Sequence, residues 1–231
     1  MAGSSFVNGM IRLVKASRSY GTPPVTALDS VSLEIGRGEF VAITGPSGSG
    51  KSTLLNLLGG LDHPTSGEVV VDGVHLEMAD DRELTLYRRL KLGIVFQFFN
   101  LLPSMSVVEN VELPLLLRGD DARESRAKAL EMLDQVGMAR RSSHFPHQLS
   151  GGEMQRAAIA RGLVHGPSLL LADEPTGNLD SANASQVLEV IAKIASRRTA
   201  TVIMVTHSDS VAALADRRIR MKDGRVAHDS P

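Results

Sequence analysis

The residues best suited to phosphate chemistry stand together near the start of the chain. Residues 45–52 fit the pattern G-x-x-x-x-G-K-[ST], with an apolar run at 40–44 before them and an apolar helical pattern at 53–58 after them. Glycines let a backbone approach an anion closely, and successive amides form a cradle that the positive end of a helix strengthens. The pattern predicts that Lys51 reaches the β- and γ-phosphates of a nucleotide and that the Ser52 hydroxyl binds Mg²⁺. The predicted nucleotide-binding residues of this loop are Gly45, Pro46, Ser47, Gly48, Ser49, Gly50, Lys51, Ser52 and Thr53.

Two acidic residues follow a second apolar run. The run at 169–172 ends at Asp173 and Glu174, and ligands bind at the carboxyl ends of strands in open α/β sheets. Asp173 is placed to support Mg²⁺, directly or through water, and Glu174 to orient or deprotonate an attacking water. A base in that position typically contributes about 10²–10⁴-fold to a rate. An isolated Asp-Glu pair would more often be solvated, but the phosphate loop upstream favours the catalytic interpretation.

A second candidate anion site lies before the apolar helical pattern at 157–163. Ser150 can cap that helix, and Gly151 and Gly152 expose backbone amides at its start. Because the chain already has one phosphate site, the simplest hypothesis is that this one serves a nucleotide held by another copy. An ordinary helix cap is the alternative, and the residues alone leave it open.

The apolar periodicity places these motifs in an α/β fold. Helices without strands occupy the middle of the chain, which predicts a helical lobe inserted into a doubly wound, mostly parallel sheet. In the helix at 122–136 the pattern places Ala127, Leu130 and Leu133 on one face, and Gly137 ends it. The expected elements are strands at 11–16, 31–35, 67–73 (with an Asp-Gly hairpin), 92–96, 168–173 and 201–205, helices at 107–117, 122–136, from 182 and at 211–215, and a final hairpin over 218–221 and 225–227.

The composition limits the classes of function. The chain has 231 residues, which allows one large domain or a core with a smaller lobe, and with 42% hydrophobic and 22% charged residues it can bury a globular core. A net charge of −1 and an aromatic content of 3% disfavour nucleic-acid binding. The sequence contains no cysteine, which suits a reducing compartment, and its patterns predict neither a signal peptide nor a membrane span.

In this order the motifs resemble the ATP-binding cassette (ABC) family over nearly the whole chain. Residues 149–155 are similar to its LSGGQ signature, residues 169–174 to its Walker B strand and residues 177–180 to its D-loop. The resemblance implies one α/β domain of the P-loop NTPase (ABC ATPase) class, with a mostly parallel sheet, an N-terminal antiparallel β-subdomain and an inserted α-helical subdomain. The implied boundaries are about 10–96 and 164–231 for the RecA-like core with the β-subdomain, and about 97–163 for the helical subdomain.

The resemblance also implies roles for single residues. Gln97 stands at the Q-loop position, which implies Mg²⁺ ligation and contact with a membrane subunit. His207 matches the switch histidine that contacts the γ-phosphate, and Tyr20 resembles the aromatic residue that stacks on adenine. The implied catalytic residues are Lys51, Glu174 and His207, the implied Mg²⁺ ligands are Ser52, Gln97 and Asp173, and the residues implied to complete the ATP site of a second copy are Ser150, Gly151, Gly152 and Glu153.

Two positions depart from the family pattern. Glu153 stands where the signature has Gln, and Gly162 stands where alanine is commoner, a change that weakens a helix by about 1 kcal/mol. Neither departure removes a catalytic group. We therefore expect an active ATPase that uses ATP and Mg²⁺.

A finer resemblance is to the group of macrolide-exporter and lipoprotein-release ATPases, on residues 97–103, 108–114 and 177–180. The family resemblance implies a self-dimer of two head-to-tail cassettes and a membrane subunit docked in a groove lined by residues 98–103, and the finer resemblance implies a separate permease with few membrane spans. The implied location is peripheral, on the cytoplasmic face of the inner membrane. A soluble cassette acting on DNA or ribosomes is the alternative, although such proteins usually carry two cassettes or a long coiled coil. A non-cassette phosphate-loop kinase or GTPase is a third hypothesis, against which the signature, Gln97 and His207 argue.

Overall fold

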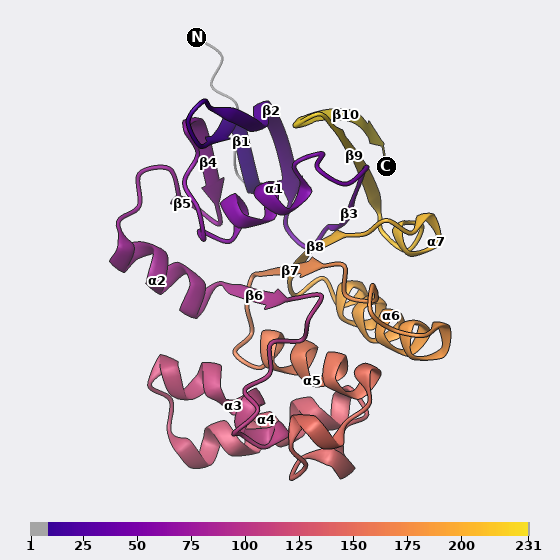
Figure 1. Ribbon diagram of the computed structural model, residues 1–231. Coiled ribbons are helices and arrows are strands. Elements are labelled where there is room, and N and C mark those ends of the chain that lie inside the picture. Colours follow the sequence, from indigo (N-terminus) through magenta and orange to yellow (C-terminus); the bar gives the residue numbers. More distant parts are fainter. Residues whose placement is uncertain (1–8, 231) are drawn as a thin grey trace.

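The computed structural model describes residues 9–230, whose strands form two sheets (Figure 1). The first sheet is antiparallel, in the order β2-β1-β4-β5. Its first two strands run longer than predicted because bulges let them pair as far as Tyr20 and Val25. The predicted hairpin is present, with left-handed φ values of 47° at Asp72 and 77° at Gly73. The strands are β1 (Gly9–Tyr20), β2 (Val25–Gly36), β4 (Ser66–Val71) and β5 (Val74–His75).

The second sheet has the order β10-β9-β3-β8-β7-β6. Neighbouring strands from β9 to β6 are parallel, and β10 pairs with β9 in the antiparallel sense. The strands β3, β7 and β8 lie where the sequence predicts them and are buried along almost their whole length, as central parallel strands are. The strands are β3 (Phe40–Thr44), β6 (Leu92–Val95), β7 (Leu169–Asp173), β8 (Thr201–Val205), β9 (Arg217–Lys222) and β10 (Arg225–Ser230).

Parallel pairing brings three strand ends to one edge of this sheet. Ile43 of β3 pairs with Val205 of β8, and Val205 pairs with Asp173 of β7. The chain leaves β3 into the phosphate loop, β8 toward His207 and β7 into Glu174. The register of the sheet therefore gathers three of the predicted motifs at the same edge.

Side chains alternate between the two faces of a strand, so the buried residues of β7 and β8 belong to two different hydrophobic clusters. Odd-numbered apolar residues of β7 and β8 pack with α1 (Lys51–Leu58) and the antiparallel sheet. Even-numbered residues pack with α5 (Gly151–Leu163) and α6 (Ser181–Ser196). Figure 1 shows α1 and α6 on opposite sides of these strands. Each fully buried Leu, Ile or Val side chain stabilises this arrangement by about 1.5–3 kcal/mol.

A third cluster joins α3 (Val107–Arg118), α4 (Ala122–Gln135) and α5. Both predicted helices are present, and Gly137, with a φ of 72°, follows the end of α4 as predicted. In Figure 1 these helices lie at the end of the molecule away from the antiparallel sheet, below β6 and β7.

The predicted buried face of α4 is wrong. Leu133 is buried, but Ala127 and Leu130 are exposed. The buried residues are Ser125, Ala129 and Leu133, which follow an i, i+4, i+8 spacing. That spacing keeps side chains on one face of a helix, and the polar Ser125 hides the stripe in the sequence.

The helix α2 (Asp81–Leu90) was absent from the predicted elements because its apolar stripe is narrow. Only Leu84 and Tyr87 of this helix are buried among the described residues. Its start nevertheless has a signal, because Asp80 and Glu83 form a capping box.

The short helix α7 (Asp209–Ala212) begins before the predicted range of 211–215 and ends earlier. The Ser208 side chain accepts a hydrogen bond from the Val211 amide and so fixes its start. Two single-turn 3₁₀ helices, Ala139–Arg141 and Pro146–Gln148, lead from α4 to α5. Within residues 9–230 no helix has both the length and the hydropathy that crossing a bilayer requires.

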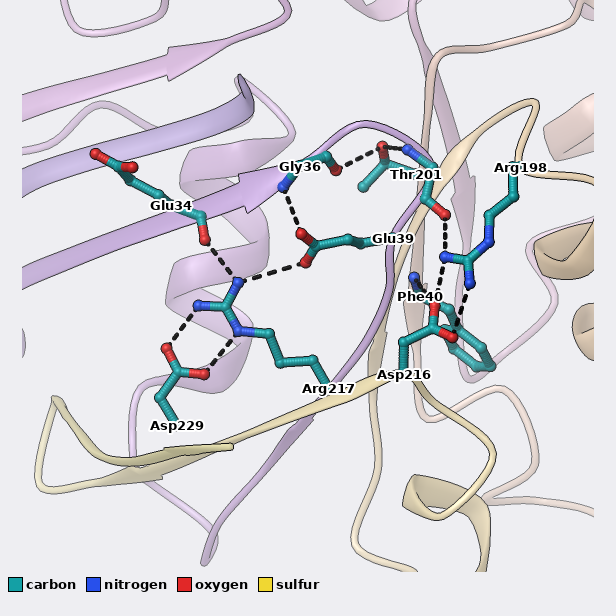
Figure 2. A network of polar contacts seen from close by, with 10 residues as sticks. Glu34, Gly36, Glu39, Phe40, Arg198, Thr201, Asp216, Arg217 and Asp229 are labelled. Carbon is teal, nitrogen blue, oxygen red and sulfur yellow. Dashed lines mark hydrogen bonds and ion pairs between the residues drawn. The ribbon is translucent and has the colours of Figure 1, made fainter. Parts of the chain in front are cut away.

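A polar network fixes the edge of the core sheet opposite the phosphate loop (Figure 2). Arg217 donates to both carboxylate oxygens of Asp229, each at 2.7 Å, and to the carbonyl oxygen of Glu34 at 2.8 Å. Asp216 accepts from Arg198 and, at 2.9 Å, from the amide that begins β3. The network therefore ties the antiparallel sheet and the C-terminal hairpin to the start of the strand that leads to the phosphate loop.

Candidate nucleotide site

The phosphate loop joins β3 to α1 and packs closely at two of its glycines. Gly45, Gly48 and Gly50 have φ values of 144°, 76° and 97°, which favour glycine. A Cβ at Gly45 would lie 2.2 Å from the carbonyl oxygen of Met221, and a Cβ at Gly50 would lie 2.5 Å from that of Ala27. A Cβ at Gly48 would meet nothing within 4 Å. The loop is thus anchored at both ends and open in the middle, where an anion can approach its backbone.

Lys51 begins α1, and its side chain turns back toward the loop. Its Nζ donates hydrogen bonds to the carbonyl oxygens of Gly45 at 2.8 Å and Pro46 at 2.9 Å. Burial lowers the pKa of the ammonium group, while the charge of Glu174, followed by that of Asp173, opposes the shift.

Beside this cation the Ser49 hydroxyl is buried and has no hydrogen-bond partner among residues 9–230. Buried polar groups normally have a partner, and an unsatisfied one is costly. A buried ammonium group and an unsatisfied hydroxyl in one loop fit an anionic ligand such as a nucleotide phosphate.

A pocket beside the loop is lined by Ala27, Gly48, Gly50, Lys51, Ser52 and Thr53. The sequence does not predict Ala27 as a residue of this site, because no motif marks it and its position depends on how β2 packs against the loop. Tyr20 is outside this lining. Its hydroxyl donates to Asp62 at 2.6 Å, and the Arg18 guanidinium lies 4.6 Å from the ring centroid, over one face. Tyr20 is 40% exposed.

Glu174 and His207 form a pair at the edge of the core sheet. Oε1 of Glu174 lies 2.7 Å from Nε2 of His207, and the Glu174 amide donates to the carbonyl oxygen of Val205 at 3.0 Å. The φ of Glu174 is 45°, and such a backbone costs about 1–3 kcal/mol and clusters at functional sites. Burial raises the pKa of the adjacent Asp173 carboxyl, and the charge of Glu174 adds to this shift against the opposing charges of Lys51 and His207.

Gln97 follows β6 and reaches the same edge. A Cβ placed on Gly177 would lie 3.0 Å from the side-chain nitrogen of Gln97 and 3.4 Å from Oε2 of Glu174, so both side chains converge on that glycine. Asn178 donates from Nδ2 to the Gln97 carbonyl oxygen at 3.1 Å. The structure therefore brings Gln97 together with Glu174, which the sequence separates by more than 70 residues.

Ser150 caps α5, as the sequence predicts. Its Oγ accepts from the Glu153 amide at 3.3 Å, and its own amide donates to Oε2 of Glu153 at 2.8 Å. Arg141 donates to the other oxygen of this carboxylate at 2.9 Å. The hydrogen bond from Ser150, followed by the Arg141 side chain, lowers the pKa of Glu153 against its burial.

The start of α5 lies close to the D-loop segment and far from the phosphate loop of the same chain. A Cβ on Gly152 would lie 2.2 Å from Oδ1 of Asn183, and a Cβ on Gly151 would lie 3.2 Å from Leu179. Figure 1 shows α5 and α1 on opposite sides of β7. The structure does not bring Ser150 and Lys51 together within one chain.

A groove of about 480 Å³ runs between α2, β6, α3 and α5. Its lining includes Phe96 and Leu117, and Arg161, whose guanidinium donates to the carbonyl oxygen of Phe99 at 2.9 Å. Of the stretch 98–103 predicted to line such a groove, only Asn100 lines it among the described residues. The docking role of residues 98–103 stays a prediction.

Comparison with known proteins decides the family. A family model described as ABC transporter matches residues 28–177. The chain belongs to the ABC transporter family. It is 46% identical, over 95% of its length and 96% of the relative's, to the uncharacterized ABC transporter ATP-binding protein MJ0796 of Methanocaldococcus jannaschii. It is also 46% identical to the lipoprotein-releasing system ATP-binding protein LolD of Chromohalobacter salexigens, over 96% and 94% of the two chains.

A third relative is the macrolide export ATP-binding/permease protein MacB of Chlorobaculum tepidum, which is 48% identical over 95% of this chain but only 34% of its own. Among solved structures, the dimeric post-hydrolysis state of the MJ0796 cassette bound to ADP and Pi superposes with a TM-score of 0.88. That match has 44% identity and covers 96% of this chain and 98% of the other. The predicted ABC ATPase fold is confirmed.

Proposed function

We propose that this chain is the ATP-hydrolysing subunit of a transporter of the lipoprotein-release or macrolide-export type, in which ATP-driven pairing of two cassettes moves a separate permease. The observation that carries the proposal is the Glu174–His207 pair, 2.7 Å apart at the same sheet edge as the Lys51 loop. The high identity to LolD and to the ATP-binding part of MacB supports the transport type.

The loop binds the phosphates of ATP through its backbone amides, the Lys51 ammonium group and the Ser49 hydroxyl. The Ser52 hydroxyl, the Gln97 amide oxygen and the Asp173 carboxylate are hard oxygen donors, which fit Mg²⁺ and would hold it. Bound there, Mg²⁺ would neutralise charge that develops on the transferred phosphoryl group.

Glu174 is the general base and accepts a proton from the attacking water through its carboxylate. His207 holds that carboxylate in place through the contact at 2.7 Å, and it donates to the γ-phosphate when ATP is bound. The strained backbone of Glu174 fixes the side chain at the sheet edge before substrate arrives. Tyr20 stacks on adenine with the ring face that Arg18 leaves free.

A second copy completes each site. Ser150, Gly151, Gly152 and Glu153 start a helix whose first amides can face a phosphate. They lie far from the phosphate loop of their own chain (Figure 1), so the nucleotide that they contact belongs to the partner copy. The helical subdomain, about 97–163, has a hydrophobic cluster of its own and can tilt relative to the core when the copies close.

The groove beside Gln97 is the docking surface for the permease. Leu117 is 61% exposed and lines the groove together with Phe96, so the groove offers apolar surface to a partner helix. Arg161 connects this surface to the segment after Gln97 through the Phe99 carbonyl group. Docking there places the chain at the cytoplasmic face of the membrane.

The test is to isolate a tagged Glu174→Gln form from native membranes in the presence of ATP and to identify the copurifying proteins. We expect a permease with few spans, lost when Leu117→Asp is added and retained with Leu130→Asp on the outside of α4. Ribosomes or DNA in place of a permease would refute the transport role in favour of a soluble cassette. In a separate assay of the wild-type protein with ATP, a phosphorylated acceptor instead of free phosphate as product would identify a kinase.

A further inference from the structure

A second pocket, of about 590 Å³, adjoins the phosphate loop on the side of the C-terminal hairpin. It shares no lining residue with the pocket beside Lys51. We call it the rear pocket, and define it by Thr44, Gly45, Pro46, His207, Asp209, Arg218, Arg220, His228 and Ser230.

Sheet geometry places the cationic groups of the rear pocket together. Arg218 and Arg220 alternate along β9 with Ile219 and Met221, which are fully buried in the core. The arginines therefore lie on the opposite face of the strand. Antiparallel pairing sets His228 of β10 beside Arg220, so the three side chains share one surface.

Among residues 9–230, neither arginine has a carboxylate partner. The guanidinium of Arg220 makes no hydrogen bond or ion pair within the part of the chain that the structure describes, and that of Arg218 donates to the Asp209 carbonyl oxygen at 2.9 Å. The other two arginines of the same hairpin are paired, Arg217 with Asp229 and Arg225 with Asp29. Within the described residues, the two arginines of the hairpin that lie outside the rear pocket are therefore paired with carboxylates, and the two that line the pocket are not.

The rear pocket also borders the catalytic groups. Its lining includes His207, which contacts Glu174, and Pro46, whose carbonyl oxygen accepts from Lys51. Of the described residues that line it, Asp209 is the only acidic one, and none is Phe, Tyr or Trp. The pocket suits a small oxyanion, because arginines bind phosphate well and nothing there would hold a nucleotide base.

We propose that the rear pocket binds inorganic phosphate and receives the phosphate product as it leaves the catalytic site. This inference rests on the proposed ATPase function. We expect bound ADP to fill the pocket beside Lys51, whereas Pro46 and His207 share the lining of the rear pocket with the two arginines. Hydrolysed phosphate would pass between these residues before it reaches solvent.

The test is to titrate inorganic phosphate into protein saturated with a non-hydrolysable ATP analogue and to follow binding by calorimetry. The terminal phosphate of the analogue fills the Lys51 side, so phosphate that still binds must occupy another site. We expect one phosphate per chain in the wild type and an affinity at least about tenfold weaker in Arg220→Ala, as for one lost charge-assisted hydrogen bond. Lys222→Ala is the matched control, because it removes a neighbouring exposed cation of β9 outside the lining. It should bind phosphate within twofold of wild type.

A fluorescent phosphate sensor should then show a changed rate of product release in a single turnover by Arg220→Ala, with the KM for ATP within twofold of wild type. Absence of phosphate uptake beside the bound analogue, or equal weakening in Arg220→Ala and Lys222→Ala, would overturn the proposal. Weakened binding with an unchanged release rate would overturn the product role, since the pocket would then take phosphate from solution only. If the wild type bound no analogue, the proposed ATPase function itself would fail. Normal hydrolysis without phosphate uptake would defeat only this inference.

Discussion

Two glycines of the phosphate loop should respond very differently to the same substitution. Both have positive φ, 144° at Gly45 and 76° at Gly48. A Cβ on Gly45 would lie 2.2 Å from the Met221 carbonyl oxygen, which belongs to a strand paired on both sides, whereas one on Gly48 would meet nothing within 4 Å. Gly45→Ala and Gly48→Ala therefore add the same methyl group to one motif in two environments.

The magnitudes follow from these contacts. Gly48→Ala costs only the backbone penalty of a left-handed residue, about 1–2 kcal/mol. Gly45→Ala adds an overpacking cost of about 1–3 kcal/mol to a backbone strain of about 1–3 kcal/mol, because β9 must shift. We expect Gly45→Ala to be the less stable variant by about 2 kcal/mol, which for a chain of this size lowers Tm by roughly a further 4–8 °C.

Urea unfolding of both variants, monitored by circular dichroism, gives the two free energies of unfolding. A nucleotide titration below the transition then compares the ATP affinities. Gly45→Ala should lose affinity as well as stability, because the moved strand carries the loop with it. Equal stability of the two variants, or a less stable Gly48→Ala, would refute the reasoning from the Met221 contact.

Three further outcomes are expected. Glu174→Gln should lower the rate of ATP hydrolysis by about 10²–10⁴-fold with ATP affinity retained, and a phosphate-release rate within twofold of wild type would remove Glu174 as the base. The depressed pKa of Glu153 means that its ionised form adds stability above the pKa of the unfolded chain, and this stability is lost as pH falls through the lower folded pKa. Glu153→Gln should therefore flatten the acid limb of a stability-against-pH curve, and an unchanged limb would contradict the Ser150 and Arg141 contacts. Gly162→Ala should raise Tm slightly, because alanine gains up to about 1 kcal/mol in helix propensity over glycine. We expect this gain to exceed the cost of the added Cβ, which would lie 3.3 Å from the Ile94 carbonyl oxygen. A lower Tm would show that the close contact dominates.

The catalytic edge could be predicted because its residues are tied to strand ends. Lys51, Glu174 and His207 each follow a short apolar run, and parallel pairing of such runs leaves little choice about where their carboxyl ends lie. The start of α5 could also be predicted from the sequence, because the cap at Ser150 depends only on residues that are neighbours in the chain.

Features that depend on contacts between distant segments could not be predicted. The buried face of α4 includes the polar Ser125, which no hydrophobic pattern marks. The place of Ala27 beside the loop depends on the packing of β2, and the rear pocket depends on the register that sets His228 beside Arg220. The helix α2 lies between these cases, because its capping box at Asp80 is local but its apolar stripe is too narrow to stand out.

The central claim is that each ATP site is shared between two copies, with the Lys51 loop of one facing the Ser150 helix of the other. The most direct measurement is the mass in solution, by light scattering, of the Glu174→Gln form with and without ATP. We expect a monomer that becomes a dimer with ATP. Adding Ser150→Arg should keep the protein monomeric while it still binds ATP. A dimer that forms equally well with Ser150→Arg, or a Glu174→Gln form that binds ATP and stays monomeric, would contradict the shared site.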